Sequence, residues 1–106
     1  MIITSGRPMI QIRRKPTAPG EILREEFLLP LGITQKQLAD HIGCDLKVIN
    51  RIINEKAQVT PKMAMKLAAA FNTTPEFWLN AQRACDLYKA SLEMKHVPAS
   101  LIKKAG

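Results

Sequence analysis

The chain has 106 residues, of which 16 are Lys or Arg and 9 are Asp or Glu, so its formal net charge is +7. This length suits one small domain, and an aromatic content of only 5% beside many Ala, Ile, Leu and Met residues favours helices over sheet. No apolar run approaches the roughly 18 residues of a membrane span, and the charge indicates either a polyanionic partner or simply a soluble basic surface.

Residues 1–16 predict a basic N-terminal arm. This segment contains four basic residues, no acidic residue and two prolines, so we expect it to be mostly irregular, with Arg13–Lys15 able to touch phosphate. The alternation in Met9–Ile12 is equally typical of one short strand. Because the arm has no uninterrupted apolar stretch, it is not expected to be a signal peptide, and we expect a soluble cytoplasmic protein.

The first predicted helix begins at Pro19, with Thr17 or Ala18 before it. Proline suits the first helical turn because its missing N–H would have no partner there. Acidic residues follow, where the helix dipole favours negative charge. Pro30 and Gly32 are expected to end the helix. Its apolar stripe consists of Ile22, Leu23, Phe27 and Leu28.

Capping residues predict four further helices, over about 34–43, 45–54, 60–72 and 74–94. Thr34 and Gln37 form a capping box, and Gly43 suits the left-handed backbone that ends a helix. Residues 17–95 are therefore expected to form an all-α, five-helix domain, followed by a frayed C-terminal tail over residues 96–106.

Residues 34–54 have the pattern of a helix-turn-helix. Ala39 is small enough to let two helices cross closely, and Gly43 permits the tight turn between them. Ile49 and Ile52 lie three residues apart and are expected to be buried on one face of the second helix. The opposite face of that second helix lies in the major groove in helix-turn-helix proteins, so the pattern predicts double-stranded DNA as the partner.

The side chains on the outer face suit DNA recognition. Arg51 can contact guanine and Asn50 adenine through paired hydrogen bonds, while Lys47 can reach guanine or phosphate and Leu46 a thymine methyl group. Phosphate contacts are expected at the start of the first helix of the pair, from Thr34, Gln35 and Lys36, and just after the second helix, from Lys56. The second helix is called the recognition helix below. The alternative is an amphipathic helix pair whose polar face is merely solvated.

The last helix allows two interpretations. Apolar residues recur along it at about helical spacing, either as intramolecular core or as the seam of a homodimer, with both roles possible for different residues. A dimer would place two reading helices about 34 Å apart on a pseudo-palindromic site. The residues concerned are Phe77, Trp78, Ala81, Cys85, Tyr88 and Leu92.

No metal, cofactor or catalytic site is expected. His41 and Cys44 are three residues apart, but Cys85 and His96 do not form a second pair with zinc-finger spacing. Two cysteines cannot make a disulfide framework, so both are expected to be reduced and in or near the core. No His, Asp or Glu set accompanies a nucleophile, so we do not expect an enzyme.

Three stretches of the chain resemble the HigA-type antitoxin family, also labelled virulence-associated protein I, within the Xre/Cro-like helix-turn-helix group. They are Pro19–Phe27 with Leu29–Ile33, the unit 34–54, and Thr60–Leu67 with Thr74–Gln82. The run Phe-Trp-Leu-Asn-x-Gln in the last stretch is more distinctive than the helix-turn-helix itself. The resemblance extends over residues 17–90, whereas the arm is longer than the leaders associated with the family.

The resemblance implies an antitoxin that binds and neutralises a small ribonuclease toxin, which cleaves messenger RNA on the ribosome, and that represses the operon encoding both proteins. It also implies operator contacts at Gln35, Lys36, Lys47, Asn50 and Arg51. It does not identify the toxin-contact surface. The alternatives are a solitary Xre-type regulator without a toxin and a protein-interaction module that has lost DNA binding. The base-reading side chains argue against the last.

Overall fold

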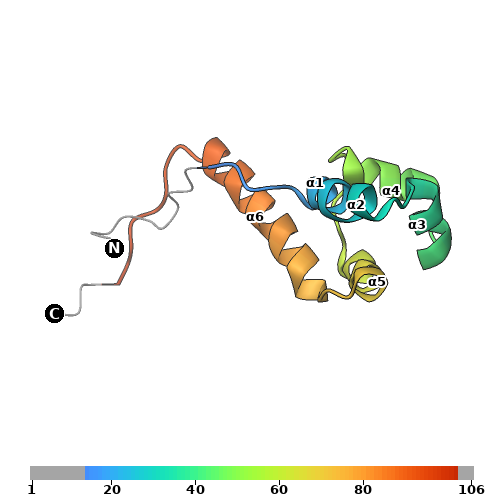
Figure 1. Cartoon of the computed structure of the whole chain (residues 1–106). Coiled ribbons are helices and arrows are strands. Elements are labelled where there is room, and N and C mark those ends of the chain that lie inside the picture. Colours follow the sequence, from blue (N-terminus) through green and yellow to red (C-terminus); the bar gives the residue numbers. More distant parts are fainter. Residues whose placement is uncertain (1–13, 103–106) are drawn as a thin grey trace.

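The computed structural model describes residues 14–102, and these contain helices and no strands (Figure 1). The helical segments are α1 (Pro19–Ile22), η1 (Leu23–Leu28), α2 (Leu29–Leu31), α3 (Gln35–Ile42), α4 (Leu46–Ile53), α5 (Pro61–Phe71) and α6 (Pro75–Glu93). Because α1, η1 and α2 follow one another without a break, they form one helix, and the described residues build the five-helix, all-α fold expected from the sequence. Residues 1–13, which include most of the predicted arm, and residues 103–106 lie outside the described part.

The first helix stops at Gly32 as predicted, but it differs from expectation in its middle and at Pro30. Its central segment η1 is a π-helix, in which the N–H of Leu29 reaches the carbonyl of Arg24, five residues earlier. Pro30 lies inside the last turn rather than ending the helix, which continues to Leu31 and stops at Gly32 with a φ of 67°. Proline inside a helix lacks an N–H and crowds the carbonyl four residues back, and the wider π-turn relieves that crowding.

The remaining helices begin at the residues that the capping patterns predict. Thr34, Asp45, Thr60 and Thr74 each accept a hydrogen bond from a backbone N–H in the first turn of the helix that follows. Asn72 ends α5 in the left-handed conformation, with a φ of 58°. The starts of these helices are thus determined by side chains within a few residues of them.

The core lies where the first helix, α3, α4, α5 and the start of α6 meet. Trp78 in α6 is completely buried, and its indole Nε1 donates to Thr73 Oγ1 over 2.7 Å. Phe27 packs against both Phe71 and Trp78, with ring centroids 4.9 and 5.4 Å apart. The other fully buried large side chains are those of Leu23, Ile49 and Leu67.

Helix α6 extends beyond the helices on which it packs. Its first half packs on α5, and its second half extends away from the other helices (Figure 1). Side chains of α6 also reach distant backbone: Gln82 Oε1 accepts the N–H of Val59 over 2.9 Å, and Cys85 Sγ lies 3.9 Å from the carbonyl oxygen of Pro16. Within residues 14–102, no helix is both long and apolar enough to cross a membrane.

Candidate nucleic-acid interface

Helices α3 and α4 are joined by a tight turn at Gly43. Gly43 has a φ of 72°, a conformation that favours glycine, and the N–H of Cys44 bonds to the carbonyl of Ala39 over 2.9 Å. Ala39 and Ile49 are buried, as the sequence predicts, together with Ile52. Since α4 buries this apolar side, its other side faces solvent with Lys47, Asn50 and Arg51.

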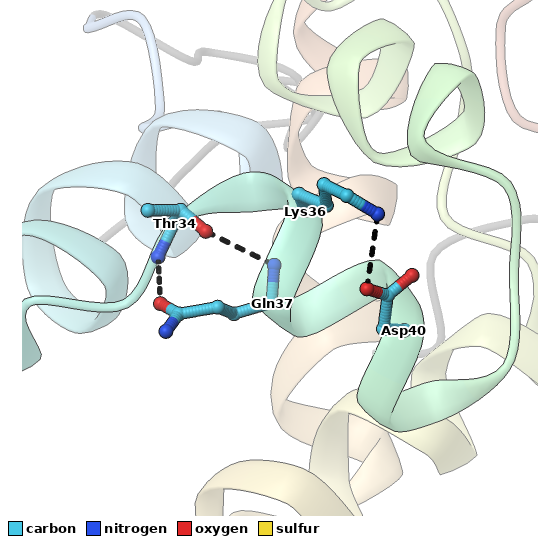
Figure 2. Close-up of polar contacts among 4 residues, drawn as sticks. All are labelled: Thr34, Lys36, Gln37 and Asp40. Atoms are coloured by element: carbon cyan, nitrogen blue, oxygen red, sulfur yellow. Dashed lines mark hydrogen bonds and ion pairs between the residues drawn. The ribbon is translucent and has the colours of Figure 1, made fainter.

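The N-terminus of α3 is held by the predicted capping box, which Figure 2 shows. Thr34 Oγ1 accepts the N–H of Gln37 over 3.0 Å, and Gln37 Oε1 accepts the N–H of Thr34 over 2.8 Å. The hydroxyl hydrogen of Thr34 and the backbone N–H groups of Gln35 and Lys36 are not used by this box. They can therefore donate to an anion, whose negative charge the helix dipole also favours.

Lys36 and Asp40 form an ion pair on the exposed side of α3, also visible in Figure 2. The distance from Lys36 Nζ to Asp40 Oδ2 is 3.2 Å, and both side chains are largely exposed. Such a pair contributes roughly 0–1 kcal/mol, so it does not prevent Lys36 from contacting a phosphate. Asp40 nevertheless places a negative charge beside a group that is expected to meet DNA.

The outer face of α4 presents the predicted base-reading residues. Lys47, Asn50 and Arg51 are all exposed, and Leu46 is 43% exposed. The carboxylate of Asp45 caps the helix by accepting the N–H of Lys47 over 2.9 Å. These side chains combine hydrogen-bond donors, acceptors and an apolar group, as recognition of base edges in the major groove requires.

The amide of Asn50 connects the two helices. Its Nδ2 donates to Gln35 Oε1 at the start of α3, and its Oδ1 accepts from Asn54 Nδ2, both over 3.2 Å. Gln35 and Asn50, predicted to contact phosphate and base respectively, are thus brought together. Asn54, the residue that follows α4, extends this pairing to the end of the helix.

The guanidinium group of Arg51 points back to the loop after α4. Its Nη2 donates to the carbonyl of Lys56 over 3.2 Å, and the Arg51 carbonyl accepts the N–H of Lys56 over 2.8 Å. Arg51 therefore holds the segment that carries Lys56, which is itself exposed beside the recognition helix. A guanidinium has five N–H groups, so this bond leaves donors for a second partner.

The residues of the predicted dimer or core helix differ in how deeply they are buried. Trp78 belongs to the core, because it is completely buried. Ala81, Cys85 and Tyr88 are half-buried, and Phe77 is 39% exposed. Farther along α6 the apolar side chains are more accessible, with Leu87 55% and Leu92 69% exposed.

Both cysteines are free thiols in half-buried positions, and Cys44 packs against the core. Burial raises the pKa of the Cys44 thiol, and burial together with the carboxylates of Glu55 and Asp86 raises the pKa of the Cys85 thiol. Both thiols are therefore protonated at neutral pH and poorly nucleophilic. Residues 14–102 contain no group of three or more His, Cys, Asp or Glu side chains placed to hold a metal ion.

Two neighbours of the predicted contacts have no site role in the sequence-based prediction. Asp40 lies four residues after Lys36, a spacing that favours a helical ion pair and was available as a signal. Asn54 shares the outer face with Asn50 at the same spacing. The partnership of Gln35 with Asn50 spans 15 residues and has no local signal.

Comparison with known proteins identifies similar sequences. A family model described as helix-turn-helix matches residues 23–78. The antitoxin HigA-1 of Vibrio cholerae is 46% identical over 80 residues, which cover 76% of this chain and 75% of that protein. An uncharacterized HTH-type transcriptional regulator of Haemophilus influenzae is 48% identical over 75 residues, covering 71% and 70% of the two chains.

A solved structure of the antitoxin GraA in complex with its operator has a similar fold. It aligns with a TM-score of 0.72 and 41% sequence identity, and the alignment covers 78% of this chain and 84% of that one. The identity extends over most of the helical domain described above.

Proposed function

Because the chain belongs to the HigA-type antitoxin family of Xre/Cro-like helix-turn-helix proteins, we propose that it is a DNA-binding antitoxin that represses its own operon and neutralises a messenger-RNA-cleaving toxin. The observation that carries the DNA-binding part is the outer face of α4, where Lys47, Asn50 and Arg51 are exposed together. Such a repressor acts in the cytoplasm, where the operator is.

Contacts to DNA fall into two groups in this proposal. Thr34, Gln35 and Lys36 at the N-terminus of α3, with Lys56 after α4, bind phosphates and place the protein on the duplex. Lys47, Asn50 and Arg51, with the apolar side chain of Leu46, read base edges in the major groove. The unused donors at the start of α3, the exposed recognition face and the net charge of +7 support this division.

A homodimer would place two such surfaces on one operator. In support, the second half of α6 exposes Leu87 and Leu92, apolar side chains that a second copy would cover. The half-buried residues Ala81, Cys85 and Tyr88 lie on the same helix. The two recognition helices would then meet half-sites about 34 Å apart, so the operator would be a pseudo-palindrome.

Toxin neutralisation is supported by family membership and by the similarity to HigA-1 of Vibrio cholerae. The experiment is co-expression of this chain, tagged, with the product of the adjacent gene. We expect the two proteins to co-purify, and the neighbour alone to arrest growth by degrading messenger RNA. A neighbour that neither binds nor harms the cell would refute the antitoxin function while leaving DNA binding intact.

The second candidate is a solitary Xre-type transcriptional regulator. The similarity to the uncharacterized HTH-type transcriptional regulator of Haemophilus influenzae favours it. Both candidates require operator binding, so the toxin experiment separates them. A regulator would be expected to bind sites at genes other than its own, which chromatin immunoprecipitation with the full chain would reveal.

A further inference from the structure

Three side-chain amides form a continuous chain of hydrogen bonds across the proposed DNA-binding surface. Asn54, at the end of α4, donates to the carbonyl oxygen of the Asn50 side chain. Asn50 in turn donates to the side-chain oxygen of Gln35, the first residue of α3. Each bond has a donor–acceptor distance of 3.2 Å. The Asn50 carboxamide is therefore held on both its nitrogen and its oxygen side.

The unused capacity of Asn50 matches one particular base. A carboxamide can donate two hydrogen bonds and accept two. The two hydrogen bonds to Gln35 and Asn54 use one donor and one acceptor of Asn50, which leaves one N–H and one lone pair. Adenine presents one acceptor, N7, and one donor, N6–H, in the major groove, and a bidentate contact with asparagine uses one group of each kind. The carboxamide of Asn50 thus keeps the one donor and the one acceptor that a bidentate contact with adenine requires.

The row of hydrogen bonds ends at Gln35, which lies at the proposed phosphate site. The side-chain oxygen of Gln35 accepts from Asn50, whereas its Nε2 donates to no other residue within 14–102. Gln35 also lies in the first turn of α3, where the helix dipole favours an anion. Donation from Nε2 to a phosphate would polarise all the hydrogen bonds of this row in one direction and strengthen each of them.

We propose that Gln35 and Asn54 are positioning residues that orient the carboxamide of Asn50 toward one adenine of the operator, with Gln35 bound to a DNA phosphate at the same time. Base reading by Asn50 then depends on a phosphate contact made by the other helix. This inference rests on the proposed function, because it requires operator binding through α4.

The test begins with duplexes that the full-length chain selects from a randomised library. The Asn50→Ala variant identifies the base pair that Asn50 reads, as the position where the preference for adenine falls roughly tenfold to hundredfold. We expect Gln35→Ala and Asn54→Ala to lower the preference at that same position. The double variant of Gln35 and Asn50 should lose no more of this preference than Asn50→Ala alone, because Gln35 acts through Asn50.

Gln35→Glu separates the two roles of Gln35. Glutamate keeps an oxygen that accepts from Asn50, but it cannot donate to phosphate and adds a negative charge. This variant should bind every duplex more weakly while keeping the preference for adenine. Asn80→Ala, which removes an exposed amide from α6, is the matched control and should change neither quantity. If the alanine variant at 35 does not fold, Gln35→Met removes the same hydrogen bonds with a side chain of similar length.

The outcomes distinguish this inference from the function on which it rests. If Gln35→Ala weakens binding to all duplexes equally and the adenine preference persists, Gln35 contacts phosphate only and the inference is overturned. The inference also fails if the single effects of Gln35 and Asn50 add in the double variant. If the wild-type chain enriches no sequence at all, the proposed function itself is wrong, and the inference falls with it.

Discussion

Gly20 in α1 packs directly against the backbone carbonyl of Ile52 in α4. A Cβ atom on residue 20 would lie 2.0 Å from the Ile52 oxygen and 2.8 Å from the Cα atom of Ile53. No L side chain fits at this distance, and the obstacle is backbone that cannot rotate away. The crossing of the first helix over α4 therefore depends on a residue without a side chain.

Gly20→Ala is expected to push α1 away from α4 and to destabilise the protein by roughly 1–3 kcal/mol or more, because the overpacking meets rigid backbone. Thermal unfolding followed by circular dichroism measures the loss. The neighbouring exposed substitution Glu21→Ala is the control and should change stability by no more than about 0.5 kcal/mol. Equal melting temperatures for the wild type and Gly20→Ala would contradict the close approach.

Lys36→Ala should weaken binding to all DNA sequences alike and reduce the slope of log affinity against log salt by up to about one phosphate contact. Titrations of operator and unrelated duplexes at several salt concentrations provide both quantities. A response limited to one operator variant would mean that Lys36 reads bases.

Asp40→Asn should act in the opposite direction. The change removes a negative charge that lies 3.2 Å from Lys36 Nζ and close to the proposed phosphate site. Binding to all sequences should become tighter, most clearly at low salt, where charges are least screened. Weaker binding in the same titrations would show that Asp40 helps recognition rather than opposing it.

Arg51→Ala is expected to have two effects. It should lose roughly 1–3 kcal/mol of discrimination between operator variants. It should also lower stability by about 0.5–1 kcal/mol, because the bond to the carbonyl of Lys56 is lost. Footprinting measures the first effect and thermal unfolding the second. A footprint unchanged in affinity and sequence preference would remove Arg51 from the recognition surface.

Leu87→Lys tests the dimer proposed through α6. Leu87 is 55% exposed, so a lysine fits the isolated protomer but not an apolar seam. Sedimentation equilibrium should show a dimer for the wild type and a monomer for the variant, with an unchanged circular dichroism spectrum. Met65→Lys on α5 is the matched control, since Met65 is 63% exposed and lies outside α6. If the Leu87 variant remains dimeric, the seam lies elsewhere.

The Cys85 thiol should react slowly at moderately alkaline pH. Its pKa is raised above the ordinary value of 9.0, first by burial and then by Glu55 and Asp86. In a Cys44→Ala background, alkylation by iodoacetamide at pH 8 should be slower for the folded protein than in denaturant. Since the fold favours the protonated thiol, the contribution of Cys85 to the free energy of unfolding is present below the ordinary pKa. It is lost as the pH rises through the raised pKa of the folded protein. Equal folded and unfolded alkylation rates would contradict the shift.

Local patterns in the sequence determined the helix boundaries. Thr34 with Gln37, and Asp45 with Lys47, form caps through atoms within three residues of one another, so neighbouring residues suffice to predict them. The burial of Ile49 and Ile52 follows equally from helical periodicity. The same reasoning could not predict the π-helical turn of η1, because it depends on how Pro30 fits into a helix that continues past it.

Only the tertiary structure decided which of these elements meet. It joined Gln35 to Asn50 across 15 residues and Gln82 to Val59 across 23, and it placed Gly20 against Ile52. The sequence by itself therefore determined the helices and their polar and apolar faces, because these depend on caps and periodicity. The packing of helices on a shared core decided how the recognition residues are paired, since contacts between distant residues depend on how the helices cross.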